Sequence, residues 1–214
     1  MAVALSIALA IAGCSTTTVT SPKPGWSCDS EADAAVHSGQ WQMALQLHQR
    51  YLESEPGNCL ALYHLGYILG KLDERQLEVD AYERAIACGY SNDDHLFFNL
   101  GMAFSELSEP DKAVAALERA IQLNPGNAEN HFGLGYVAHL ADHNARAVKA
   151  LRQAIDLSAD HLDARNLLAR IYLDQGRLDE AKKQLQEIQR REPDNQEALA
   201  LWEIYKDRVK TSYE

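Results

Sequence analysis

The sequence is poor in positive charge and contains no cluster of basic residues. It has 20 lysines and arginines against 31 aspartates and glutamates, which gives a formal net charge of −11. Such a chain repels nucleic acid and anionic lipid surfaces, so charge-driven binding to either is excluded. Proline and glycine are also infrequent, with 6 and 12 residues, and this excludes a collagen-like or low-complexity chain.

Catalytic motifs are missing as well. The sequence has no G-x-S-x-G nucleophile turn, no phosphate-binding loop and no H-E-x-x-H zinc motif. His139 and His143 have a spacing at which a helix can present two histidines to zinc, but no third ligand is spaced with them, and we expect His143 in a turn. We therefore predict no enzymatic activity, no cofactor, no metal site and no small-molecule substrate.

Long hydrophobic runs are absent except at the N-terminus. Residues 1–13 are uncharged and mostly apolar. This run is too short to span a bilayer and is typical of a signal-peptide core, although the usual positive residues before the core are missing. The stretch Ile11-Ala12-Gly13-Cys14 resembles the bacterial lipoprotein box, in which the cysteine becomes the lipidated first residue. An ordinary secreted protein with small residues before a cysteine is the alternative.

The lipoprotein resemblance implies a location and a tether. Ser15 follows the lipidated cysteine, and the Gram-negative sorting rule that the resemblance implies lets serine at this place proceed to the outer membrane. Residues 14–24 are rich in Ser, Thr and Pro and are typical of a flexible tether. We expect a palmitoylated lipoprotein of the bacterial cell envelope, anchored in the outer membrane and facing the periplasm.

A short motif recurs through the rest of the chain. A Leu-Gly or Leu-Ala pair returns with spacings of 35, 34 and 34 residues, and an Ala-x-x-x-Leu-x-x-Ala pattern follows in phase. The pattern resembles the tetratricopeptide repeat, whose period is 34 residues. The pairs are Leu65-Gly66, Leu100-Gly101, Leu134-Gly135 and Leu168-Ala169, and the downstream pattern includes Ala113-Leu117-Ala120 and Ala147-Leu151-Ala154.

The resemblance implies an all-α, right-handed superhelical solenoid of antiparallel helix pairs. Glycine inside a helix costs about 1 kcal/mol relative to alanine, and we expect the close approach of the second helix to offset that cost. Glu78 stands where a small alanine is usual, so we expect looser packing or a local kink there. The predicted units are 25–58, 59–93, 94–127, 128–161 and 162–195, with a capping helix at 196–214.

The resemblance also implies a concave face lined by the first helix of each unit. Aromatic residues and methionine fall on two rows of that face, and exposed apolar patches of this kind mark interaction sites; packing between units is the alternative explanation. We expect Gly133 on the exposed side, where it would open a dent between two aromatic rings. The predicted partner-binding residues are Tyr63, His64, Tyr67, Phe98, Asn99, Met102, Phe132, Tyr136 and His139.

Three cysteines remain after Cys14 is assigned to lipid, and an exported chain resides where disulfides persist. In the implied repeat, the start of the first helix lies beside the end of the second. Cys59 and Cys88 are therefore the best candidate pair, and Cys28–Cys59 is the alternative. Closing the loop between Cys59 and Cys88 stabilises the fold by about 3 kcal/mol in the chain-entropy model.

The sequence therefore predicts a non-catalytic, lipid-anchored scaffold that binds a protein or peptide in its concave groove. Some repeats of this kind clamp a peptide carboxylate through Lys, Arg and Asn at the fifth and sixth positions of the first helix, and here only Asn99 fits. An acidic peptide tail is therefore a poor ligand, and the partner should be apolar or basic because the chain is acidic. Resemblance to lipidated tetratricopeptide proteins suggests assembly of a type IV pilus, secretin or secretion apparatus. Adaptors or regulators of peptidoglycan enzymes, and enzyme accessory domains, are the alternatives.

Overall fold

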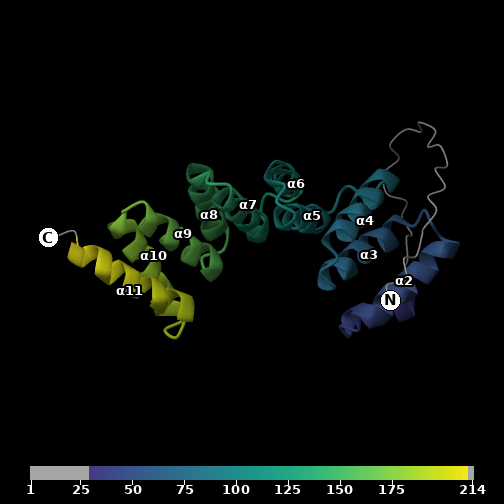
Figure 1. Ribbon diagram of the computed structural model, residues 1–214, viewed down its shortest axis with the longest axis horizontal. Coiled ribbons are helices and arrows are strands. Elements are labelled where there is room, and N and C mark those ends of the chain that lie inside the picture. Colours follow the sequence, from purple (N-terminus) through teal and green to yellow (C-terminus); the bar gives the residue numbers. More distant parts are fainter. Residues whose placement is uncertain (1–28, 212–214) are drawn as a thin grey trace, which may run out of the picture.

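The computed structural model describes residues 29–211, which form eleven α-helices and no strand (Figure 1). The all-α prediction is confirmed. The predicted signal peptide, Cys14, the tether and Cys28 lie outside the described residues. The helices are α1 (Ser30–His37), α2 (Trp41–Ser54), α3 (Cys59–Lys71), α4 (Arg75–Cys88), α5 (Asp94–Glu106), α6 (Pro110–Leu123), α7 (Ala128–Leu140), α8 (Asn144–Leu157), α9 (Leu162–Asp174), α10 (Leu178–Arg191) and α11 (Gln196–Thr211).

Polar caps at a regular spacing start the first helix of each pair. The side chains of Asn58, Asp93, Asn127 and His161 accept hydrogen bonds from backbone amides in the first turns of α3, α5, α7 and α9. Asn195 does the same for α11, at 2.9 Å from the amide of Ala198. Such caps satisfy amides that have no partner within the helix. The loop sequence thereby sets where each unit begins.

A residue with left-handed backbone conformation ends the turn between the two helices of every pair. These residues have φ angles between 58° and 71°, and two of them are glycines. A left-handed residue just beyond a helix C-terminus lets the chain reverse while the last carbonyl groups stay hydrogen-bonded. The five residues, each 34 or 35 positions from the next, are Gly39, Asp73, Ser108, Asp142 and Gly176.

The recurring glycines lie where the two helices of a pair come closest, as predicted. A Cβ atom on Gly66 would lie 2.6 Å from the Tyr82 ring, and one on Gly135 would lie 2.7 Å from Cγ of Leu151. Gly101 meets Leu117 in the same way, also at 2.7 Å. Real Cβ contacts are essentially never this short. Only glycine lets these backbones approach so far, so close packing offsets its low helix propensity.

Glu78 does not loosen its unit, contrary to our expectation. It is 5% exposed and lies within one continuous helix, α4. Space for its carboxylate comes from Gly70 on α3, where an added Cβ would lie 2.5 Å from the Glu78 Oε1 atom. Arg75 Nη1 donates to Glu78 Oε2 at 2.9 Å and to the Gly70 carbonyl at 2.8 Å. A second glycine and an arginine thus accommodate the larger side chain.

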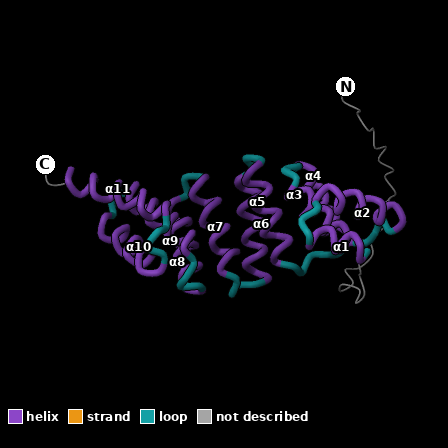
Figure 2. Tube along the Cα trace, turned by 90° about the horizontal axis from the view of Figure 1, so that it is seen from below, coloured by secondary structure: helices purple, strands orange, loops and turns teal. Residues whose placement is uncertain are grey.

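The pairs form an arched row. In Figure 1 the arch has α2 and α11 at its lower ends and α6 near its top, with α3 below α4 and α5 below α6; Figure 2 shows the same row from below. Contacts run between successive first helices from α3 through α9 and on to α11, whereas successive second helices of the described residues have no comparable contacts. The first helices therefore form the inner, more closely packed layer of the arch.

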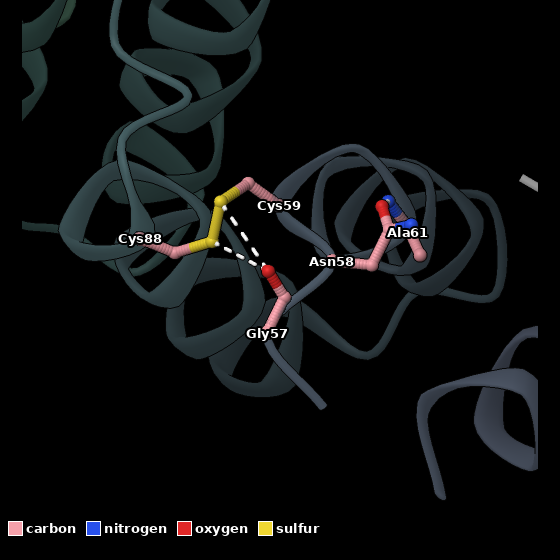
Figure 3. Close-up of a disulfide and its surroundings, with 5 residues drawn as sticks. All are labelled: Gly57, Asn58, Cys59, Ala61 and Cys88. Atoms are coloured by element: carbon pink, nitrogen blue, oxygen red, sulfur yellow. Dashed lines mark hydrogen bonds between the residues drawn. A yellow bond between two sulfur atoms is a disulfide. The ribbon is translucent and has the colours of Figure 1, made fainter. Parts of the chain in front are cut away.

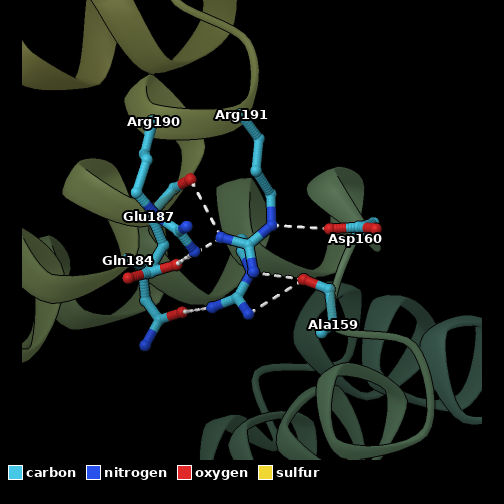
Figure 4. A network of polar contacts seen from close by, with 7 residues as sticks. Ala159, Asp160, Gln184, Glu187, Arg190 and Arg191 are labelled. Carbon is cyan, nitrogen blue, oxygen red and sulfur yellow. Dashed lines mark hydrogen bonds and ion pairs between the residues drawn. The ribbon is translucent and has the colours of Figure 1, made fainter.

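A polar network joins the fourth pair to the fifth at the outer side of α9 (Figure 4). The buried Arg165 guanidinium donates to the Ala159 carbonyl at 2.9 and 3.1 Å and to Gln184 at 2.9 Å. Arg191 donates to Asp160 at 2.6 Å. Hydrogen bonds from Arg190 and Arg191 lower the pKa of Glu187 to about 2. The loop between α8 and α9 is thus held by side chains of the following pair.

A disulfide closes the second pair. Cys59, the first residue of α3, is bonded to Cys88, the last residue of α4, and their Cα atoms are 5.6 Å apart (Figure 3). The carbonyl oxygen of Gly57 lies 3.3 Å from the Cys88 sulfur. The antiparallel arrangement of the two helices brings these ends together, and the alternative partner for Cys59, Cys28, is not the one it takes.

Candidate protein-binding groove

Four adjoining hollows run along the inner layer of the arch. Their volumes are about 320 Å³ between α3, α5 and α7, 180 Å³ between α3, α4 and α5, 300 Å³ between α5 and α7, and 370 Å³ between α7, α9 and α11. Neighbouring hollows share lining residues: Tyr67 and Phe98 belong to the first two, and Phe132 and Tyr136 to the last two. Together they form one continuous groove.

All of the predicted partner-binding residues except His64 line this groove. They come from the first helix of three successive units and are half-buried, so each offers part of its surface to solvent and part to the core. The groove residues are Tyr63, Tyr67, Phe98, Asn99, Met102, Phe132, Tyr136 and His139.

His64 points elsewhere. Its Nδ1 atom lies 3.1 Å from Asp33 Oδ1 on α1 and 3.4 Å from His48 Nε2 on α2. Burial lowers the pKa of His64, although the nearby Asp33 carboxylate acts in the opposite direction. The sequence predicted His64 on the concave face because the sixth residue of the first helix faces inward in an average unit of the repeat. Here the preceding pair covers that position.

The aromatic residues of the groove partly support one another. The Tyr63 ring stacks on Tyr90 with a centroid distance of 5.1 Å and an angle of 19°. Burial, followed by the charge of Asp93, raises the pKa of Tyr63 to about 12. The phenol of this tyrosine is therefore neutral at physiological pH. Each of these rings packs against its neighbours and also keeps part of its surface exposed. Partner binding and packing between units, the two explanations for the aromatic rows, are therefore compatible.

Gly133 does not open a dent in the groove. It is buried, and an added Cβ would lie 2.8 Å from the Phe98 ring and 2.9 Å from Leu117 Cδ2. The ring of Phe98 from the preceding unit thus occupies the space that a side chain at Gly133 would need. Our prediction of an exposed position was wrong because it considered the unit alone, and the neighbouring helix α5 covers that side of α7.

Charged groups lie at the middle and at the C-terminal end of the groove. Arg75 forms ion pairs with Glu78 and with Glu106, a groove residue on α5. At the other end Arg170 and Glu197 are paired at 2.6 Å. The lining holds five acidic and three basic residues: Glu78, Glu106, Glu129, Asp163 and Glu197 against Lys71, Arg75 and Arg170.

A larger hollow of about 630 Å³ lies on the other side of the array, between α6 and α8. Its lining combines apolar residues such as Ile121 and Leu134 with charged ones, among them Glu118 and Arg146, which form an ion pair with each other. It is confined to one gap between pairs, and no Phe, Tyr, Trp or Met side chain lines it. We therefore regard the inner groove, with its row of half-buried rings, as the better candidate site.

The histidine pair considered in the sequence does not form a ligand set. The Nδ1 atom of His139 lies 3.0 Å from Asn144 Oδ1, and His143 is the residue that precedes α8. The described residues also contain no helix both long and apolar enough to cross a membrane.

Comparisons with known proteins agree with this architecture. Sequence profiles of the tetratricopeptide repeat match residues 96–127 and 138–201. The tetratricopeptide repeat-containing protein trd-1 of Caenorhabditis elegans is 26% identical over 177 residues, 83% of this chain and 22% of that protein. The human protein O-mannosyl-transferase TMTC1 is 27% identical over 158 residues, 72% of this chain and 17% of that protein. The chain spans only about a fifth of the length of these two relatives.

Solved structures share the fold. YrrB, described as a TPR protein with an unusual peptide-binding site, superposes with a TM-score of 0.70 and 22% sequence identity, covering 80% of this chain and 88% of its own. The phased glycines, the capped helix pairs, the inner layer of first helices and these matches lead to one conclusion. Residues 96–127 and 138–201 match the tetratricopeptide repeat, and the described residues fold as a tetratricopeptide-repeat solenoid.

Proposed function

We propose that this protein is a non-catalytic scaffold that holds a segment of another protein in its inner groove. The observation that carries the proposal is the row of half-buried aromatic and methionine side chains along four adjoining hollows. Aromatic residues and methionine are enriched where protein interfaces are buried. Because the repeats hold these side chains in place before binding, little conformational entropy is lost when a partner docks.

The chemistry of the groove favours an apolar segment flanked by basic residues. Acidic residues outnumber basic ones in its lining, and the whole chain carries a net charge of −11. Opposite charge on the partner speeds the encounter and suppresses wrong partners. The similarity of the fold to YrrB, a TPR protein with an unusual peptide-binding site, supports a peptide segment as the bound form.

We place this scaffold in the bacterial cell envelope, attached through a lipid on Cys14. The lipoprotein-like stretch before Cys14 supports the anchor. The disulfide between Cys59 and Cys88 supports an extracytoplasmic location, because disulfides persist in oxidising compartments. A lipid-anchored groove facing the periplasm suits the assembly of a multi-protein envelope machine such as a type IV pilus, a secretin or a secretion apparatus.

The groove is tested by replacing Tyr67, Phe98 and Tyr136 together by alanine and comparing native co-purification from detergent-solubilised membranes. We expect loss of the bound partner with unchanged helicity by circular dichroism. Recovery of pilus or secretin subunits with the unmodified protein supports the envelope-assembly role. Recovery of peptidoglycan enzymes instead points to an adaptor of cell-wall synthesis.

The matched control replaces Ile121, Lys149 and Gln153 by alanine. These residues line the hollow on the other side of the array, so this variant keeps the partner if the inner groove is the site. Equal capture by the groove variant and the unmodified protein contradicts the proposal.

A further inference from the structure

Three helices of the N-terminal part bring three ligand-type atoms together away from the groove. Asp33 Oδ1 comes from α1, His48 Nε2 from α2 and His64 Nδ1 from α3. The two histidine nitrogens are 3.4 Å apart, and they lie 3.7 and 3.1 Å from the carboxylate oxygen. This triangle of nearly equal sides is formed by residues that the proposed function does not use.

The buried histidine has its proton on the far side of the ring. His48 is 0% exposed, and its Nδ1 lies 3.0 Å from the Ala44 carbonyl, an acceptor that requires Nδ1 to donate. In the neutral ring, Nε2 then carries a lone pair aimed at the other two groups. Asp33 Oδ1 is likewise buried, and the ring nitrogens of His48 and His64 lie 3.7 and 3.1 Å from it. A proton on His64 Nδ1 can be donated to only one of the two facing acceptors, so the other keeps a buried lone pair without a partner, which is costly unless a cation lies between the three groups.

We propose that Asp33, His48 and His64 bind one divalent transition-metal ion, for which Zn²⁺ is the best fit. Zinc binds imidazole nitrogen and carboxylate oxygen at about 2.0–2.2 Å in tetrahedral geometry, which places neighbouring ligand atoms about 3.4 Å apart. The three observed separations bracket that value. Two imidazoles and one carboxylate are a set that zinc accepts, whereas Ca²⁺ and Mg²⁺ require more oxygen ligands.

Because the three ligands come from three helices, we assign the ion a structural role. Its fourth coordination position is open to water. Helix α1 has eight residues and packs against α2. A shared ion would tie α1 directly to both α2 and α3, in addition to the small apolar cluster in which Ala32 and Ala35 of α1 take part with Ile68 of α3. The side chains of Asp33 and His64 are 33% and 26% exposed, so water can complete the tetrahedron from the solvent side.

The test uses the full chain, purified in detergent, with its free thiols alkylated so that Cys14 and Cys28 cannot supply ligands. Titration with Zn²⁺ in a calorimeter should show one ion bound per chain. Co²⁺, used as a coloured substitute, should give the intense visible absorption of a four-coordinate site. His64→Gln and Asp33→Asn should each weaken zinc binding by more than about 100-fold, because losing a supporting residue alone costs 10–100-fold.

A second readout separates the metal site from a merely structural contact. Hydrogen exchange of α1 amides should slow on zinc addition in the unmodified chain and stay unchanged in His64→Gln. His131→Gln is the matched control, since His131 lies on α7, with its Nε2 beside the Pro125 carbonyl of the preceding loop, and this variant should bind zinc normally. Absence of zinc binding, or equal binding by His64→Gln and the unmodified chain, overturns the proposal. Neither result bears on the groove.

Discussion

At the scale of single residues, Glu78 and Gly70 depend on each other. The Glu78 carboxylate occupies the space that a Cβ on Gly70 would need. Burial raises the pKa of Glu78, although the hydrogen bond and charge of Arg75 counteract part of that rise. The glycine on α3 is therefore required by a side chain on α4, and not by the backbone of its own helix.

We expect Gly70→Ala to destabilise the fold by about 1–3 kcal/mol, because the added methyl group overpacks this contact. Glu78→Ala together with Gly70→Ala should be more stable than Gly70→Ala alone, since the carboxylate is then absent and alanine has the higher helix propensity. Urea unfolding followed by circular dichroism measures all members of the cycle. Strictly additive effects would show that the two side chains do not interact.

At the scale of helices, the disulfide fixes the two ends of the α3–α4 pair. The bonded residues are separated by 29 positions, and closing such a loop stabilises the folded chain by about 3 kcal/mol in the entropic treatment. Cys59 is buried, so the bond also sits at the edge of the core.

We expect the pair of substitutions Cys59→Ala and Cys88→Ser to lower the melting temperature. Adding a reductant should lower the melting temperature of the unmodified chain by a similar amount and leave that of the variant unchanged. Thermal unfolding with and without dithiothreitol makes this comparison. A reductant-sensitive variant would mean that another thiol pair contributes.

Asp94 links helix α5 to the start of α7. Its Oδ2 atom accepts hydrogen bonds from Asn127 at 2.8 Å and Asn130 at 2.9 Å. Burial alone would raise the pKa of Asp94, but these two hydrogen bonds, together with the charge of His95 and a backbone hydrogen bond, leave the pKa below its ordinary value. A carboxylate with a depressed folded-state pKa stabilises the fold at any pH above its unfolded pKa, and that contribution is lost as the pH falls through the folded pKa.

We therefore expect the contribution of Asp94 to be intact at neutral pH and to disappear in the acidic range below the ordinary aspartate pKa, near 3.9. Asp94→Ala should be less stable than the unmodified chain at pH 7, and the difference should shrink as the pH approaches 2. Urea unfolding at a series of pH values measures it. A difference that stays constant with pH would assign the effect to packing.

At the scale of the whole molecule, the groove and the proposed anchor belong to different parts of the chain. The described residues form an arch whose inner face carries the groove. They contain no helix that could cross a membrane. The lipid anchor that we propose depends on the thiol of Cys14.

We expect Cys14→Ser to move the protein from the membrane fraction to the soluble fraction, because the thiol that carries the lipid is gone. Fractionation of cells expressing each form, with immunodetection, measures the distribution. Ser15→Ala is the matched control, since it alters the neighbouring residue and retains the thiol. Retention of Cys14→Ser in the membrane fraction would exclude the lipid anchor.

The sequence by itself determined the all-α architecture and the phase of its repeats. Small residues at Gly66, Gly101 and Gly135 recur every 34 or 35 positions, and polar caps precede each first helix. These signals act within one unit, between residues close in the chain, so a periodic pattern reveals them. The same pattern placed most groove residues on the inner layer.

Only the tertiary structure decided the contacts between units, because those contacts do not repeat. Gly133 is filled by Phe98 of the preceding unit, and His64 turns toward the first pair. Asp33, His48 and His64 come together from three helices. Their spacing in the sequence matches no metal-binding motif, so the sequence gives no sign of this cluster. Such pairings depend on how each unit stacks on the next, where individual side-chain volumes override the average position that a repeat assigns.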